Sequence, residues 1–91
     1  MKIVINDCYG GFGLSKKALA LYNERAGTVL RYEYDIKRND PILVEIVEQL
    51  GEAANGDFAE LKVVEIPDDV QWQIQEYDGD EWIAEKHRTW N

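Results

Sequence analysis

A glycine-rich segment near the start of the chain is the first place where residue types and spacing point to chemistry. It reads CYGGFGLS over residues 8–15, follows a short apolar run, and is followed directly by Lys16 and Lys17. Glycines permit positive φ angles and close approach to the backbone, and a helix N-terminus offers free N–H groups at the positive end of its dipole. The segment is therefore a candidate anion site, formed by Tyr9, Gly10, Gly11, Phe12, Gly13, Ser15 and Lys16.

In a nucleotide complex the glycine backbone, Ser15 and Lys16 would hold phosphate, and Tyr9 or Phe12 would stack on a base. The spacing matches neither G-x-x-x-x-G-K-[ST] nor G-x-G-x-x-G, the two common nucleotide fingerprints. The alternative is that the glycines only make a tight turn between a strand and a helix. Both interpretations stay open on the sequence.

The single cysteine and the single histidine raise the question of nucleophilic or metal chemistry. Cys8 precedes a predicted helix N-terminus, a position that lowers the pKa of a thiol, but His87 is 79 positions away (87 − 8). No spacing typical of a catalytic triad or a zinc site accompanies them. We therefore assign no catalytic residue, no metal and no cofactor, and expect Cys8 to pack. A small hydrolase that uses Cys8 or His87 is the least favoured alternative.

The last third of the chain carries all three tryptophans and reads as a β-hairpin around Asp78-Gly79. With a two-residue turn, Trp82 lies opposite Gln75 on an open face that also carries Tyr77, which is a plausible binding surface. A three-residue turn with a bulge would move Trp82 to the core face. Both registers stay open, and the candidate interface residues are Tyr77, Trp82, His87 and Trp90.

Positive charge is concentrated in three places, at residues 16–17, 37–38 and 86–88. Two or three of these clusters could converge on an anionic small molecule, within one chain or across a subunit interface. Arginine binds phosphate with a bidentate geometry, so Arg88 is a further candidate ligand residue. The alternative is that the three clusters are solvated ends of elements.

Short elements must position these residues, and the pattern predicts them in the order β-α-β-α-β followed by a β-hairpin. Helices are predicted at residues 16–26, capped by Ser15, and at 41–50, where Asp40 caps and Pro41 takes the first position. Alternating strands and helices favour a mixed sheet with parallel pairs and right-handed crossovers. The fold class is α/β (α+β), one small domain over residues 1–91, with strands before the hairpin at residues 2–6, 28–36 and 60–66.

Length and charge exclude several classes of function. The 91 residues include 18 carboxylates against 10 lysines and arginines, a net charge of -8, which argues against binding of duplex nucleic acid. No run reaches the roughly 18 to 20 apolar residues that cross a bilayer, and the first residues are unlike a signal peptide. One cysteine suits a reducing cytoplasm, so the expected localisation is cytoplasmic, without membrane binding.

Three long segments resemble a group of small proteins encoded by bacteriophages and prophages. The segments are IVINDCYGGFGLS, NDPILVEIVEQLGEAANG and EIPDDVQWQIQEYDGDEWIAEKHRTW, and CYGGFGLS and EKHRTW are the most specific parts. The group carries no settled activity, so the resemblance implies a source and a bacterial host cytoplasm. It also implies the kind of role that small accessory phage proteins often have, which is to block host defences.

The sequence therefore predicts a non-enzymatic phage accessory protein that sequesters a phosphate-containing nucleotide signal, such as a cyclic nucleotide or an ADP-ribose derivative. A chain this short offers little concave volume, so we expect a homo-oligomer with the pocket between subunits. The alternative is a protein–protein inhibitor or adaptor that acts on a host protein through Trp82, Tyr77 and the C-terminal residues.

Overall fold

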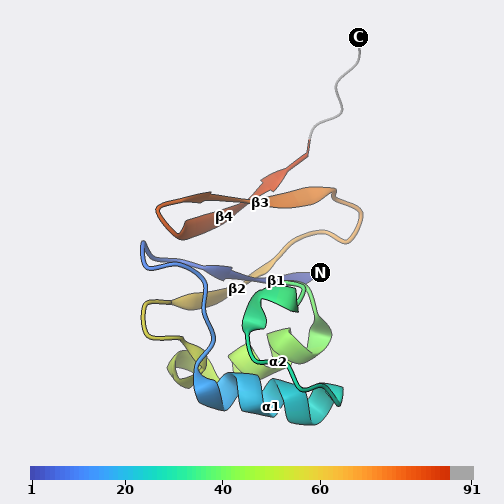
Figure 1. Ribbon diagram of the computed structural model, residues 1–91. Coiled ribbons are helices and arrows are strands. Elements are labelled where there is room, and N and C mark those ends of the chain that lie inside the picture. Colours follow the sequence, from blue (N-terminus) through green and yellow to red (C-terminus); the bar gives the residue numbers. More distant parts are fainter. Residues whose placement is uncertain (87–91) are drawn as a thin grey trace.

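The structure is a computed structural model and describes residues 1–86. Its elements stack in three layers, with both helices on one side, β1 and β2 in the middle, and the β3–β4 hairpin on the other side (Figure 1). The α+β class with two helices is therefore confirmed. The elements are β1 (Lys2–Asn6), α1 (Lys16–Ala26), η1 (Glu33–Asp35), α2 (Pro41–Leu50), η2 (Gly51–Ala54), β2 (Leu61–Glu65), β3 (Trp72–Tyr77) and β4 (Asp80–Glu85).

The middle layer is an antiparallel pair of strands, β1 and β2, with apolar residues on both faces. Because successive side chains of a strand point to opposite faces, Val4 and Val63 pack against the helices, and Ile3 and Ile5 point toward the hairpin. Both faces of β1 are buried. This explains why its sequence is a continuous apolar run instead of an alternating one.

Both helices begin at the predicted caps. The Ser15 side chain accepts a hydrogen bond from an amide in the first turn of α1, and the Asp40 side chain does the same for α2 with Pro41 at the first position. Helix α1 ends at Gly27 in the left-handed conformation, with φ 70°, where a side chain would be strained. The core between the helices and β1 consists mainly of apolar residues of both helices, namely Ala18, Tyr22, Leu43, Val44, Ile46 and Val47.

The predicted strand at residues 28–36 is wrong. Only the short 3-10 turn η1 forms there, and the side chains of Val29, Tyr32 and Tyr34 are exposed. The predicted parallel pairs and the mixed sheet are wrong as well, because every strand pair within the described residues is antiparallel. The observed order is therefore β-α-α-β followed by the hairpin.

The edge of β1 that a further strand would need is already occupied, which explains the difference. The Val4 N–H donates to the Arg38 carbonyl at 2.8 Å, and the Arg38 guanidinium donates to the Val4 carbonyl at 3.3 Å. Nearby, the Asn23 side chain bonds both the N–H and the C=O of Leu30, at 3.0 and 2.8 Å. A β-rich composition is a local preference, and such tertiary contacts override it.

A hydrogen bond between the two helices generates a pH-dependent prediction. The Tyr22 hydroxyl donates to Asp40 Oδ2 at 2.7 Å, and this bond, together with burial, raises the pKa of Tyr22 to about 12 from an ordinary 10.0. Because the folded pKa is the higher one, the stabilisation is fully present below pH 10 and is lost as the pH rises through about 12. We expect Tyr22→Phe to lower the free energy of unfolding by about 1 kcal/mol at pH 7.

Urea titrations of the wild type and Tyr22→Phe between pH 7 and 12 measure this effect, with Tyr34→Phe as the control because Tyr34 is exposed. The stability difference between wild type and Tyr22→Phe should shrink above pH 10. A difference that is the same at pH 7 and pH 12 would contradict the assignment.

Candidate functional site

The glycine-rich loop between β1 and α1 lies directly against two other loops. A Cβ built on Gly10 would stand 1.7 Å from the Phe58 carbonyl oxygen, and a Cβ built on Gly79, in the hairpin turn, would stand 2.4 Å from the Gly11 nitrogen. Only residues without a side chain allow such approaches. Gly10 and Gly79 therefore allow the glycine loop, the 56–59 loop and the hairpin turn to pack in direct contact. This packing is a structural role for the motif.

Ser15 and Gly13 are also engaged inside the protein. Ser15 Oγ accepts from the Ala18 N–H at 3.1 Å and donates to the Ala53 carbonyl at 2.7 Å. The Gly13 carbonyl accepts from the Gly56 N–H at 2.9 Å. The Lys16 side chain is exposed. The Ser15 hydroxyl could therefore donate to a phosphate oxygen only if it gave up the hydrogen bond that it donates to the Ala53 carbonyl.

The aromatic and acidic neighbours of the loop do not favour a nucleotide. The Phe12 ring has the Arg38 guanidinium 3.5 Å above its centroid, so one face of the ring is used within the protein. A cavity of about 230 Å³ beside the loop is lined by Glu33 and Asp57, whose carboxylates would repel an anion. Tyr9 is 71% exposed and is the candidate residue with the most accessible ring in this loop.

A buried ion pair joins the hairpin to the middle layer. Arg38 Nη1 and Nη2 donate to the two carboxylate oxygens of Glu81 at 2.6 and 2.8 Å, and Glu81 also accepts the Asn6 N–H at 2.8 Å. The Glu81 side chain is only 9% exposed. Bidentate geometry and the additional hydrogen bond offset the desolvation of the two charges.

Sequence reasoning missed this pair, although one signal was present. The hairpin register that places Trp82 on the open face also places Glu81 on the same face as Ile83, toward the middle layer. A carboxylate on a core-facing position needs a cationic or hydrogen-bonding partner. The register alone does not identify Arg38 as that partner, because the two residues lie 43 positions apart.

The fully buried Asn6 side chain ties three segments to the end of β1. Its Nδ2 donates to the carbonyls of Cys8 and Gly79 at 2.8 and 2.7 Å, and its Oδ1 accepts the Glu60 N–H at 2.8 Å. Cys8 itself donates through Sγ to the Phe58 carbonyl at 3.2 Å. These contacts agree with the packing role expected for Cys8.

The hairpin turn has two residues, as one of the two predicted registers requires. Asp78 and Gly79 both have positive φ, 52° and 89°, the geometry that matches the twist of the strands. Gln75 lies opposite Trp82. The side chains of Tyr77 and Trp82 are 69% and 45% exposed. We name this surface the hairpin outer face; it consists of Gln73, Gln75, Tyr77, Asp80, Trp82 and Ala84.

The basic clusters do not come together within residues 1–86. Lys16 begins α1 in the helical layer, and Arg38 is bound to Glu81. The backbone N–H of Lys86 donates to the Gln71 carbonyl, which places Lys86 at the end of the hairpin away from the turn. The predicted site residues His87, Arg88 and Trp90 lie outside the described residues.

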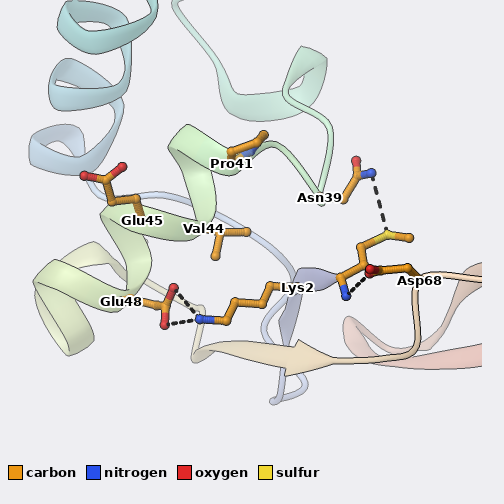
Figure 2. A pocket seen from close by; sticks show the side chains of 8 residues that line it. Lys2, Asn39, Pro41, Val44, Glu45, Glu48 and Asp68 are labelled. Carbon is orange, nitrogen blue, oxygen red and sulfur yellow. Dashed lines mark hydrogen bonds and ion pairs between the residues drawn. The ribbon is translucent and has the colours of Figure 1, made fainter.

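An open pocket of about 540 Å³ lies where the start of β1 meets α2 (Figure 2). Four of its charged groups pair with one another, Lys2 with Glu48 at 3.0 Å and the Met1 amino group with Asp68, and Glu45 pairs with Arg25 outside the pocket. The hydrogen bond and charge of Glu48 raise the pKa of Lys2, and the amino group lowers the pKa of Asp68. Both shifts favour the charged forms, so neither group is suited to proton transfer near neutral pH.

A second pocket, of about 500 Å³, lies between β2 and β4, and we name it the inter-sheet groove. Strand β4 packs against β1 and not closely against β2, which leaves one side of β2 open beneath β4. Apolar side chains form most of its lining, namely Ile5, Val64, Ile66, Pro67, Val70 and Ile83, and Asp7, Lys62, Glu81, Trp82 and Glu85 also line it.

Within the part of the chain that the structure describes, no group of three or more His, Cys, Asp or Glu side chains could hold a metal ion. In the same residues, no helix has the length and apolar character needed to cross a membrane. Comparison of the chain with protein-family models, with curated proteins and with solved structures found no match. The contacts, burial and charges of the described residues are therefore the basis for a functional proposal.

The buried ion pair leads to a stability prediction. We expect Arg38→Met to lower the free energy of unfolding by about 3 kcal/mol, because it leaves the Glu81 carboxylate desolvated without a counter-charge. Lys2→Met removes an exposed pair, with both side chains more than 40% accessible, and should cost at most about 1 kcal/mol. Urea unfolding of the two variants makes the comparison, and equal losses would contradict the dominant role of the Arg38–Glu81 pair.

Proposed function

We propose that this chain is a non-enzymatic binding protein that acts on another protein through its β3–β4 hairpin. The observation that carries the proposal is the two-residue turn, because this register leaves Trp82 and Tyr77 accessible on the hairpin outer face. Large aromatic side chains supply much of the binding energy of protein interfaces. The glutamines beside them supply hydrogen bonds at little desolvation cost compared with charged groups.

The negative charge of the hairpin favours a partner with a basic surface. Residues 72–85 contain five carboxylates and no lysine or arginine. One of the five, Glu81, is neutralised by Arg38, and four remain on a short element. Complementary charge accelerates association and disfavours wrong partners. A partner with lysines or arginines around an apolar contact therefore fits this surface.

Sequestration of a phosphate-containing nucleotide stays a prediction of the sequence, with less support from the geometry. The Ser15 hydroxyl and the Arg38 guanidinium are used in internal bonds. Glu33 and Asp57 line the cavity beside the glycine loop. An anion there would require rearrangement, or groups from a second subunit.

The biological setting that we propose is that of an accessory protein of a bacteriophage, with a host protein as the target. The resemblance of CYGGFGLS and EKHRTW to small phage proteins supports this setting. An inhibitor or adaptor that works by binding needs no catalytic group, and the described residues offer no paired nucleophile and base.

Site-specific photo-crosslinking in a bacterial lysate tests the proposal. A photoreactive phenylalanine analogue at position 77 or 82 should crosslink to one host protein, and the same analogue at position 29 should not. Val29 is the matched control because it is an apolar side chain that is 94% exposed and belongs to the segment between α1 and η1, outside the hairpin. The double variant Tyr77→Ser/Trp82→Ser should reduce capture of that host protein at least tenfold, while Val29→Ser leaves capture unchanged.

Capture that is insensitive to the double variant would contradict the proposal. The nucleotide prediction has its own readout in a thermal-shift panel of cyclic dinucleotides and ADP-ribose derivatives. A melting temperature that rises with one of these compounds in the wild type but not in Lys16→Ala would favour sequestration instead. Lys16 is exposed, so this substitution should not perturb the fold.

A further inference from the structure

We infer that the partner binds as an extended segment that adds a strand to the free edge of β4 and places alternate apolar side chains in the inter-sheet groove. This inference rests on the proposed function and specifies its binding mode. Three observations lead to it: the hydrogen-bond pattern of the hairpin, the position of the groove, and the charges along the groove.

The hairpin register determines which backbone groups of β4 are free. The Lys86 N–H donates to the Gln71 carbonyl at 2.8 Å. Hydrogen-bonded pairs alternate along an antiparallel ladder, so Ala84, Trp82 and Asp80 also bond to β3. The residues between them point their N–H and C=O groups away from β3, and no backbone partner for these groups is found within residues 1–86. They are Glu81, Ile83 and Glu85.

The inter-sheet groove lies along this free edge. Its lining includes four residues of β4 and none of β3, so it is on the side of β4 that is not paired. Val64 and Ile5 from the middle layer contribute apolar surface beside Ile83. A strand added to β4 would therefore have backbone donors and acceptors on one side and an apolar channel for alternate side chains. This is the combination used when a peptide binds by strand addition.

Charge along the groove specifies the partner further. Asp7 and Glu85 line the groove with Lys62 and with Glu81, whose carboxylate is already neutralised by Arg38. Side chains of an added strand alternate between the groove and the hairpin outer face, where Asp80 and the rings of Tyr77 and Trp82 lie without a lysine or arginine among the six residues of that face. The segment that fits is one with apolar residues toward the groove and lysines or arginines between them, which meet the carboxylate and the aromatic rings of the outer face. The outer edge of β3 is free as well, but no β3 residue lines the groove, so that edge offers hydrogen bonds without an apolar channel.

The experiment uses the whole protein and a capped hexapeptide of sequence Lys-Val-Lys-Val-Lys-Val, with a Glu-Val counterpart as the control. NMR-detected hydrogen exchange should show protection of the Ile83 and Glu85 amides when the lysine peptide is added, and the tryptophan fluorescence of the protein gives the affinity. We expect the lysine peptide to bind at least tenfold more tightly than the glutamate peptide. N-methylation of alternate peptide amides, on the side that faces β4, should abolish the protection.

Two proline variants separate the two edges of the hairpin. Proline removes a backbone donor and is tolerated where a strand N–H faces solvent. Glu85→Pro acts on the free edge of β4 and should weaken lysine-peptide binding at least tenfold. Glu76→Pro acts on the free edge of β3 and should leave binding unchanged. Because the Glu76 carboxylate also accepts the Gly79 N–H at 3.0 Å, Glu76→Gln is measured beside it to separate loss of this carboxylate from loss of the backbone donor. Both residues are exposed, and circular dichroism checks that both variants fold.

Several results would overturn the inference. They are an equal effect of the two proline variants, protection of β3 amides instead of β4 amides, and equal binding of the two peptides. Protection of Ile83 and Glu85 without peptide, in a concentration-dependent dimer, would assign the groove to a second copy of the chain. The proposed function fails separately: crosslinking from positions 77 and 82 that survives Glu85→Pro would retain a protein partner but exclude strand addition.

Discussion

The bidentate pair between Arg38 and Glu81 is the interaction on which the arrangement of the layers depends. It connects the loop before α2 with the start of β4, and both residues also bond the edge of β1 that β2 does not occupy, Arg38 at the Val4 carbonyl and Glu81 at the Asn6 N–H. A two-stranded hairpin is at best marginally stable alone. The Arg38–Glu81 pair holds the hairpin against β1, and buried opposite charges are costly to separate. The orientation of the hairpin over β1 is therefore fixed.

That orientation decides what the protein can present to a partner. Because the hairpin sits over β1, one side of β2 remains open and the inter-sheet groove forms beneath the unpaired edge of β4. The same placement brings the Gly79 turn against Gly11, so the glycine loop is used to pack the hairpin turn. The geometry therefore favours the hairpin over the glycine loop as the binding surface. It also favours a basic protein segment over a small anion as the bound partner.

The parts that sequence reasoning predicted are those governed by local chemistry. Caps at Ser15 and Asp40, Pro41 at the first helical position and the end of α1 at Gly27 depend on residues a few positions apart, and they were all predicted. The Asp78-Gly79 turn was predicted as one of two registers. The strand at residues 28–36 was predicted wrongly, because its composition is β-rich but the edge it needed is filled by Arg38. The Asn6, Arg38 and Glu81 network was missed, because its members are far apart in the chain.

The sequence by itself determined the class of the fold, the bounds of both helices, and a C-terminal hairpin whose residues 72–85 carry acidic and aromatic side chains without a lysine or arginine. These features follow from backbone preferences and side-chain periodicity, which act over a few residues. Only the tertiary structure decided which strands pair, which register the hairpin takes, and which charges are neutralised. Those outcomes depend on competition for the same strand edge and on desolvation of distant groups, and neither is encoded in any short stretch of residues. The net charge of -8 follows from the sequence. That Glu81 is neutralised by Arg38, which leaves four carboxylates of the hairpin for a partner, follows only from the tertiary structure.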